Sequence, residues 1–533
     1  MADHDADVVI VGSGALGAQV AHECANAGKS VILLEAGKPT PNWKLTENWR
    51  TAADKGNFNV MFGNLDYAPN SYTPGYIEAD VPISNYPATL RTVGGTARHW
   101  TAIAWRFLPE EMKMQSTFGV GRDWPIDYDE LEPFYTEAEY RIGVNGVTDA
   151  DQSGQQRGHT YPPRSRPYPL PPEAKPYFLQ RFEMRASRLG YDVQCGPNAR
   201  ISQPYAGRPA CIGNNLCSWN CPIDAKYSGA RGVELAVAAG AELRADAIVD
   251  RIETDGQGKV TSISYLDPTG ATRTTLTAKA YVLAAHGFET PKLLLMNEIG
   301  NSSGMVGRNL MMHPTMPTEF YADEPLFRGR GSNIHGAILQ RRLEDTRGEM
   351  TAGFWQFVNT SPAVEIASGL MKEGGPLGQD LDAELRDRAS RVMGINQLTE
   401  DLPEVTNGIE LNGNWKDSLG SPGLKLHYKL GDYVKAALPR AYEDFANYMR
   451  AMNGTFSYGP TPDRMFFQHH IMGTVMMGDD PSNSVVDKDL RCHDHDNLYC
   501  VTTGVWPSAS CVNPTLTGIA MAIRAGRHIA AEV

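Results

Sequence analysis

The sequence predicts an α/β fold, and three features near its N-terminus lead to this expectation. Residues 7–12 form a short apolar strand that runs directly into Gly12-Ser-Gly14-Ala-Leu-Gly17. Residues 18–28 have helical composition and end in glycine, and residues 30–35 form a second apolar strand that ends in Glu35. A strand, a glycine-rich turn, a helix and a second strand in this order make a βαβ unit. We therefore expect a Rossmann-like dinucleotide-binding domain.

Each residue type in this fingerprint has a physical reason. Gly12 makes the tight turn, and Gly14 lets the backbone approach a pyrophosphate at the N-terminus of the helix. Gly17 permits close packing of the helix on the strand, and Glu35 can accept a hydrogen bond from a ribose 2′-hydroxyl. The fingerprint alone does not distinguish NAD from FAD.

Length and charge exclude several classes of protein. The 533 residues allow three to four ordinary domains or two large ones. The net charge of −13 argues against a nucleic-acid-binding protein, which needs a basic face. No apolar run is long enough to span a membrane, and the mean hydropathy is −0.36. The acidic start of the chain lacks the cationic region of a cleavable signal peptide.

The cysteines fall into two groups. Three of the eight form a C-x5-C-x3-C-P pattern at Cys211, Cys217 and Cys221, with Gly213, Asn214 and Asn215 between the first two. Such turn-forming residues can aim several thiolates at one point. Three thiolates without a nearby fourth ligand suit a three-iron cluster better than a tetrahedral zinc site. A disulfide plus one free cysteine is the alternative. The other five cysteines are expected to be small buried residues.

The middle of the chain carries fewer signals. Residues 150–177 are polar and rich in proline, which predicts an extended connection. The strand-like stretches 248–263 and 279–285 are expected to return to the first sheet. Residues 320–460 mix strands and helices without a recognisable motif, and the charged segment 380–391 fits a solvated helix.

The C-terminal region has a pattern that suits chemistry. His469-His470 precedes Gly473-Thr474, and Asn513-Pro514-Thr515 opens an apolar-periodic helix. Asn513 is a suitable N-cap and Pro514 a suitable first helical residue. The N-terminal end of this helix would offer N–H groups and positive potential to an anion.

Taken together, these segments resemble the glucose–methanol–choline (GMC) oxidoreductases, which are flavoproteins that oxidise alcohols. The resemblance rests on motifs at both ends and in the middle of the chain. They are the N-terminal fingerprint, Gly94-Gly95-Thr96 with His99-Trp100, Trp124-Pro125 with 131–135, Gly287 with 290–295, 306–310 with His313-Pro314, His470 with Gly473-Thr474, and Asn513-Pro514. Within the family, the cysteine pattern is similar to that of the FAD/iron–sulfur catalytic subunits of bacterial glucose, fructose, sorbitol and gluconate dehydrogenases.

The resemblance implies a fold, cofactors and site residues. It implies an FAD-binding domain from residues 1–110, 210–320 and 460–533, interleaved with an α+β substrate-binding domain of GMC type from 111–209 and 321–459. The iron–sulfur loop lies at 211–222, with Cys211, Cys217 and Cys221 as ligands of a [3Fe-4S] cluster. Besides Gly12, Gly14, Gly17 and Glu35, the implied FAD-binding residues are Gly94, Gly95, Thr96, His99, Val249, Asn513, Pro514 and Thr515.

His470 matches the family's catalytic base, and Asn513 matches the second residue of its catalytic pair. His469 is the competing candidate, which we interpret as a supporting or packed histidine. Thr96-Ala-Arg-His99-Trp100 is similar to the segment of pyranose oxidases in which histidine is bonded to the flavin. His99 is therefore expected either to form this covalent bond or to hydrogen-bond near the isoalloxazine.

A cluster beside FAD implies one-electron transfer to an external acceptor rather than direct reaction with oxygen. The expected function is oxidation of a sugar, polyol or sugar acid. The implied partners are a small subunit carrying the export signal and a multihaem cytochrome c or another acceptor. The acceptor is expected on another protein because the chain has no C-x-x-C-H motif for a c-type haem of its own. The implied location is the periplasmic side of the bacterial inner membrane, with the cytoplasm as the alternative. A glucoside 3-dehydrogenase and an electron-transfer module without its own substrate remain alternative functions.

Overall fold

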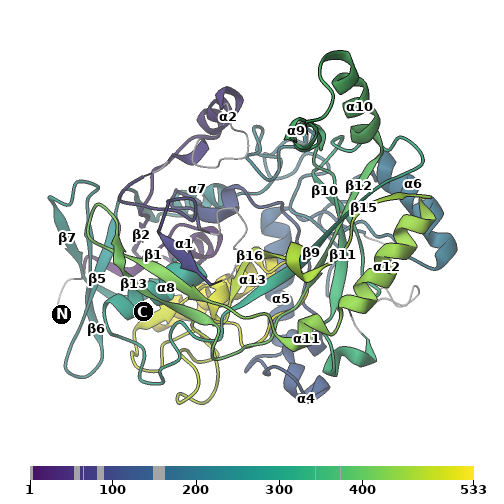
Figure 1. The fold of residues 1–533 in the computed structure, drawn as a ribbon. Helices are drawn as coiled ribbons and strands as arrows, with labels where there is room; N and C mark the ends of the chain where they lie inside the picture. Colours follow the sequence, from purple (N-terminus) through teal and green to yellow (C-terminus); the bar gives the residue numbers. More distant parts are fainter. Residues whose placement is uncertain are drawn as a thin grey trace.

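The computed structural model describes residues 4–52, 61–63, 65–80, 89–147, 162–342, 344–372 and 374–533. In Figure 1 the two ends of the chain lie on the same side of the molecule, and the N-terminal segment (purple) lies beside the C-terminal helix (yellow). The part of the molecule that contains the dinucleotide fingerprint is therefore assembled from segments far apart in the sequence.

A five-stranded parallel sheet carries the fingerprint. Its strand order is β17-β8-β1-β2-β4. The strands are β1 (Ala6–Val11), β2 (Val31–Leu34), β4 (Glu242–Arg244), β8 (Ala278–Leu283) and β17 (Leu498–Cys500). Apolar runs such as β1 and β2 are buried on both faces, as parallel strands between covering layers must be. The predicted βαβ unit is confirmed, with helix α1 at Ala15–Asn26 between β1 and β2.

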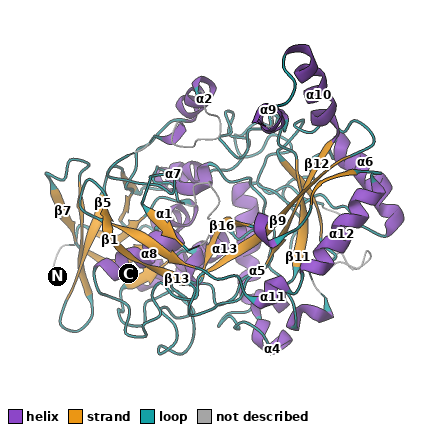
Figure 2. Cartoon of the chain, in the orientation of Figure 1, coloured by secondary structure: helices purple, strands orange, loops and turns teal. Residues whose placement is uncertain are grey.

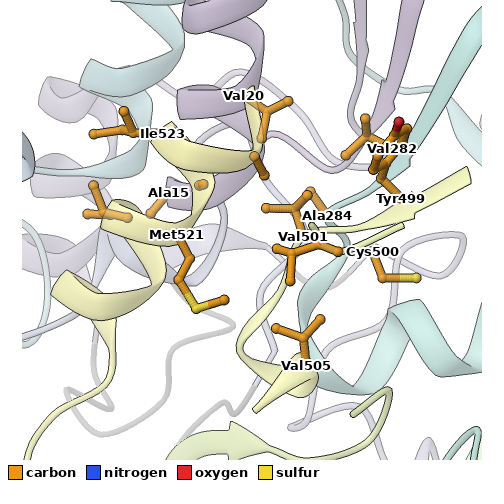
Figure 3. Close-up of a cluster of buried hydrophobic side chains, with 14 of the residues drawn as sticks. Ala15, Val20, Val282, Ala284, Tyr499, Cys500, Val501, Val505, Met521 and Ile523 are labelled. Atoms are coloured by element: carbon orange, nitrogen blue, oxygen red, sulfur yellow. The ribbon is translucent and has the colours of Figure 1, made fainter. Parts of the chain in front are cut away.

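Helices α1, α7 (Gly229–Ala238), α8 (His286–Met296) and α13 (Thr515–Glu532) pack around this sheet. Figure 3 shows apolar side chains of α1, α13 and the strands β8 and β17 in one cluster, among them Val20, Ile523, Val282 and Val501. All four of these side chains are buried. The C-terminal helix is thus part of the core that holds the N-terminal fingerprint.

The expectation that residues 248–263 return to the first sheet is wrong. These residues form β5 (Ile248–Thr254) and β6 (Val260–Leu266), which pair with β7 (Arg273–Leu276) in a separate antiparallel sheet of three strands. Several residues along β5 and β7 are exposed, so these strands are not buried on both faces as a central parallel strand is. The second stretch, 279–285, does contribute β8 to the first sheet.

A six-stranded antiparallel sheet forms the second half of the molecule. Its strands are β9 (Met311–Tyr321), β10 (Ile334–Ile338), β11 (Gly353–Val358), β12 (Val392–Thr399), β15 (Thr455–Tyr458) and β16 (Phe466–Met472). Helices α6 (Tyr177–Ala186) and α12 (Leu438–Ala451) lie along one side of this sheet (Figure 2). Their aromatic residues share a buried cluster with strand residues such as Phe320 and Trp355. Strand β16 brings His469 and His470 to this sheet through its pairing with β9.

Further elements complete the fold. They are β3 (Ile77–Ala79), β13 (Gly408–Lys416) and β14 (Pro422–His427), which form a small sheet, and helices α2 (Asn42–Thr51), α4 (Met114–Phe118), α5 (Tyr128–Ile142), α9 (Ala363–Lys372), α10 (Gly378–Arg391) and α11 (Asp432–Lys435). The predicted solvated helix is α10, which has no buried residue. In the Pro-rich connection, residues 162–176 contain no helix or named strand, and 150–161 lie outside the described residues. Among the helices of the described ranges, none has the length and apolarity that crossing a bilayer requires.

The interleaved domain boundaries stay a prediction. At the level of sheets, β9 and β16 both belong to the six-stranded sheet, although they fall within ranges assigned to the FAD-binding domain. They form the seam between the two halves, and the candidate site lies along this seam.

Candidate active site

The fingerprint turn is packed too tightly for side chains. Gly12 has φ +102°, and a Cβ there would lie 2.6 Å from the Ala284 carbonyl oxygen. A Cβ on Gly17 would lie 2.0 Å from the Gly12 oxygen. By contrast, a Cβ on Gly14 would meet nothing within 4 Å, because Gly14 faces the open space in front of α1. The turn thus presents bare backbone to that space.

Glu35 ties the turn to the second strand and to another glycine pair. Its carboxylate accepts hydrogen bonds from the Ser13 N–H (3.1 Å), the Ser13 hydroxyl (2.6 Å) and the Gly37 N–H (2.9 Å). The Ser13 hydroxyl also accepts from the Gly94 N–H at 3.2 Å. Burial raises the pKa of Glu35, while these hydrogen bonds act in the opposite direction. The sequence did not single out Ser13, because a serine within the glycine motif has no pattern of its own.

An elongated cavity of about 450 Å³ begins at this turn. Gly12, Gly14 and Glu35 line one part of it, and His470 and Asn513 line another. Of the cofactor residues expected from the sequence, Gly17 and Gly94 do not line it. The others do: Gly12, Gly14, Glu35, Gly95, Thr96, His99, Val249, Asn513, Pro514 and Thr515. Segments from many distant parts of the chain therefore enclose a single space.

His470 makes a hydrogen bond that fixes its ring. Its Nδ1 lies 2.8 Å from Nδ1 of His313, and the two rings stand nearly perpendicular, with an interplanar angle of 83°. One of the two Nδ1 atoms must carry the proton. Because this contact uses Nδ1, the ring nitrogen of His470 that remains for a ligand is Nε2.

Asn513 precedes the N-terminus of α13 and faces the same cavity. The helix begins at Thr515, and the Asn513 side-chain oxygen finds no hydrogen-bond partner among the described residues although it is buried. The expectation that Asn513 caps the helix is therefore wrong. A buried amide oxygen without a protein partner is free to bind a ligand.

The histidines around the cavity are neutral near pH 7. Burial holds the pKa of His470 well below its ordinary value, and it lowers the pKa of His469 and of His286 to about 4. His286 also lines the cavity, and the sequence did not identify it. Its position directly after β8, at the carboxyl end of a parallel strand, is the signal that could have found it.

His99 and Trp100 form another part of the wall. His99 lies just after the short 3₁₀ helix η1 (Gly95–Arg98), and burial together with His469 holds its pKa well below the ordinary value. The Trp100 indole N–H donates to the Tyr227 carbonyl at 2.6 Å. The neutral imidazole of His99 is the nucleophilic form of this side chain.

The cysteine loop, residues 211–222, adjoins the cavity. Ser218 of this loop lines the cavity wall. The backbone N–H of Gly213 donates to the Cys211 sulfur, and the backbone N–H of Lys226 donates to the Cys221 sulfur, both at 3.4 Å. All three cysteines are free thiols, so the alternative of a disulfide within the loop is not formed here. Burial raises the pKa of the Cys211 thiol to about 11.

In the part of the chain that the structure describes, no three His, Cys, Asp or Glu side chains converge closely enough to hold a metal ion. The thiols are thus not gathered around a single ion as in a zinc site. A polynuclear cluster carries its cysteine ligands on separate irons, so it does not need the sulfurs to meet at one point. The donor chemistry, three free thiols of which two accept backbone N–H groups, fits such a cluster.

Similarity to family models and to a full-length relative shows which family this chain belongs to. Residues 186–315 and 403–522 match two family models, each described as GMC oxidoreductase, and residues 7–44 match a model described as FAD binding domain. The fructose dehydrogenase large subunit of Gluconobacter japonicus is 36% identical over 542 residues, which cover 98% of this chain and 97% of that protein. The chain belongs to the GMC oxidoreductase family.

Other relatives of this GMC oxidoreductase also match along their whole length. The 2-methyl-1,2-propanediol dehydrogenase of Mycolicibacterium austroafricanum is 29% identical over 98% of this chain and 95% of that protein. The gluconate 2-dehydrogenase flavoprotein of Pantoea cypripedii is 25% identical over 96% of this chain and 91% of that protein. Among solved structures, pyridoxine 4-oxidase from Mesorbium loti shares the fold, with a TM-score of 0.64 at 16% identity over 98% of this chain and 99% of that one.

The cavity of this GMC oxidoreductase fits FAD. Its bare backbone at Gly14 suits a pyrophosphate, the Glu35 carboxylate suits a ribose, and the unpartnered Asn513 oxygen lies in the same space. The predicted fold class, enzyme class and flavin cofactor are thereby confirmed: the protein is an FAD-dependent oxidoreductase.

Proposed function

We propose that this protein is a dehydrogenase that oxidises a hydroxyl group of a sugar, polyol or sugar acid and passes the electrons to an external acceptor. The observation that carries the proposal is that His470 and Asn513 line the same cavity as the dinucleotide fingerprint. A neutral histidine and an amide that line one cavity suit a substrate hydroxyl. The fructose and gluconate dehydrogenase subunits among the relatives support polyhydroxylated substrates.

His470 serves as the base in this proposal. For its Nε2 to accept the hydroxyl proton, its Nδ1 must carry the other proton and donate it to His313. His313 is therefore a positioning residue that selects the tautomer of His470. Asn513 holds the substrate oxygen beside the base. When bound, FAD accepts the hydride that leaves the substrate carbon.

Holding FAD falls to the residues around the fingerprint turn and the start of α13. We assign the pyrophosphate to Gly12 and Gly14, with Gly17 packing the turn, and the ribose to Glu35. Gly94, Gly95, Thr96, His99, Val249, Pro514 and Thr515 complete the binding surface. The first turn of α13 supplies positive potential to the flavin ring.

His99 either bonds the flavin covalently or lies against it. Yellow colour left wholly in the supernatant after acid precipitation would exclude the covalent bond.

We propose further that Cys211, Cys217 and Cys221 hold a [3Fe-4S] cluster. A cluster accepts one electron at a time, which suits transfer from a two-electron carrier to a cytochrome. Ser218 lines the cavity between two of these cysteines, so the loop lies next to the flavin site. A multihaem cytochrome c is the proposed acceptor, and a small subunit bearing the export signal would carry the folded protein to the periplasmic side of the inner membrane.

Replacement of the base provides the main test. We expect His470→Ala to keep its FAD but to lose roughly 10²–10⁴-fold in the rate of flavin reduction by substrate, because general-base catalysis is removed. Stopped-flow bleaching of the flavin absorbance with a panel of sugars and sugar acids measures this rate, and NMR of the product separates a 3-keto sugar from other products. His469→Ala is the control. A wild-type rate in His470→Ala, or no bleaching of the wild-type protein by any member of the panel, would contradict the proposal.

The cluster is tested by single serine replacements. Each of Cys211→Ser, Cys217→Ser and Cys221→Ser should lower the iron content and the broad visible absorbance, because serine is a poor ligand for iron–sulfur clusters. Cys195→Ser, which alters a partly buried cysteine outside the loop, should retain both. Equal iron in all four variants after anaerobic purification would refute the assignment.

A further inference from the structure

Lys226 links the cysteine loop to the wall of the flavin cavity. Its side-chain ammonium donates hydrogen bonds to the carbonyl oxygens of Arg98 (3.0 Å), Trp100 (2.8 Å) and Cys217 (2.6 Å). The first two carbonyls flank His99, and the third belongs to the cysteine next to Ser218. One side chain therefore joins a segment of the cavity wall to the loop that carries the proposed cluster ligands.

The geometry requires a charged lysine. Three acceptors occupy three N–H groups, and only the ammonium form has three. The side chain is nearly inaccessible, with 2% of the residue exposed. Among the described residues no carboxylate pairs with it, and its ammonium lies against the carbonyl oxygen of Cys217 in the cysteine loop. A buried charge without a counter-charge is costly, so this site is built for a nearby anion.

The neighbouring Arg200 makes the contrast clear. It is also buried beside the cysteine loop, but Glu173 pairs with it at 2.9 Å. Arg200 is therefore neutralised by the protein itself. Lys226, like Arg98 and Arg208, is buried and has no ion pair among the described residues. Of these three cations, Lys226 is the one whose side chain donates to the carbonyl of a proposed cluster ligand, Cys217.

We propose that Lys226 is the counter-charge of the iron–sulfur cluster held by Cys211, Cys217 and Cys221, and that it raises the reduction potential of that cluster. The inference rests on the proposed cluster. A thiolate-ligated cluster is anionic and becomes more negative when it accepts an electron, so a fixed cation beside it favours the reduced form. The same ammonium fixes the spacing between the cluster loop and the segment 98–100.

The test measures the potential of the cluster in the whole protein, by EPR during an anaerobic redox titration. We expect Lys226→Met to shift the equilibrium for cluster reduction at least about tenfold toward the oxidised form, which is a fall of about 59 mV for a one-electron couple. Lys226→Arg, which keeps the charge, should stay close to the wild type. Lys292→Met is a control matched in burial, because Lys292 contacts Glu289 and Tyr76 rather than the cysteine loop.

The possible failures are distinguishable. Absence of iron from the wild-type protein overturns the proposed cluster and this inference with it. An intact cluster with an unchanged potential in Lys226→Met overturns the inference alone. If Lys226→Met does not assemble the cluster, Lys226→Gln and Lys226→Arg decide: a cluster retained only in the arginine variant supports the assignment. A cluster retained at wild-type potential in the glutamine variant, or lost from both, overturns it.

Discussion

His470 and His313 form a pair whose protonation is set by burial. Burial holds the pKa of His470 well below its ordinary value and lowers that of His313 to about 4. Both rings are thus neutral between pH 6 and 8, where a free histidine titrates. A base that is neutral throughout this range does not have to lose a proton before it acts.

This pairing predicts the pH dependence of flavin reduction. In the wild type the rate should be flat from pH 6 to 8 and should fall only at lower pH, where His470 becomes protonated. His313→Leu removes the acceptor for the Nδ1 proton, which disfavours the neutral tautomer whose Nε2 is free to accept a proton. We expect the plateau to fall roughly tenfold or more, with little change in KM.

Asparagine offers a matched control at this position, because its side-chain oxygen can accept the same proton. His313→Asn should therefore recover most of the rate that His313→Leu loses. Stopped-flow reduction between pH 4.5 and 8 supplies the profiles. An unchanged profile in His313→Leu would leave His313 with a packing role only.

At the scale of elements, the tightest constraint is the contact between α1 and the turn before it. A Cβ at Gly17 would lie 2.0 Å from the backbone oxygen of Gly12, and backbone cannot move aside cheaply. We expect Gly17→Ala to destabilise the protein by about 1–3 kcal/mol or more and to lower its FAD content. Gly256→Ala, where a Cβ meets nothing within 4 Å, is the control. The ratio of flavin to protein absorbance and the thermal midpoint report the outcome, and equal FAD retention in both variants would contradict it.

Two predictions from the sequence were wrong, and both concern how a secondary-structure element is placed in the fold. Local composition identified β5 and β6 as strands, but which sheet a strand joins depends on partners such as β7 that come later in the chain. Asn513 has the right residue type for a cap, yet its oxygen faces the cavity because the chain reaches α13 from that side. Residue preference is local, whereas pairing and orientation are decided by tertiary contacts.

At the scale of the molecule, the two chain ends depend on each other for stability. Ile523 of α13 is fully buried in the cluster shared with α1 and β8 (Figure 3). We expect Ile523→Ala to cost about 2–5 kcal/mol and to weaken FAD binding, although residue 523 does not line the cavity. Thermal unfolding followed by both flavin fluorescence and circular dichroism should show the two transitions falling together. A loss of helix signal that leaves the flavin bound would contradict this coupling.

The candidate site was only partly predictable from the sequence, because tertiary contacts bring several of its residues together. The fingerprint, His470 and the three cysteines carry sequence signals because spacing along the chain determines their chemistry. His313, His286, Ser13 and Lys226 become visible only when distant segments meet. Lys226, for example, has no motif, and its role follows from carbonyl groups more than a hundred residues earlier in the chain.

The wall of the cavity has a consequence for biosynthesis. The fingerprint turn leaves the ribosome long before Asn513, Pro514 and Thr515, which line the same cavity. A nascent chain cannot enclose the flavin until α13 has emerged and packed on α1. Cofactor capture thus has to wait for α13, and a chain truncated before α13 would leave the ribosome as an apoprotein without a closed binding site.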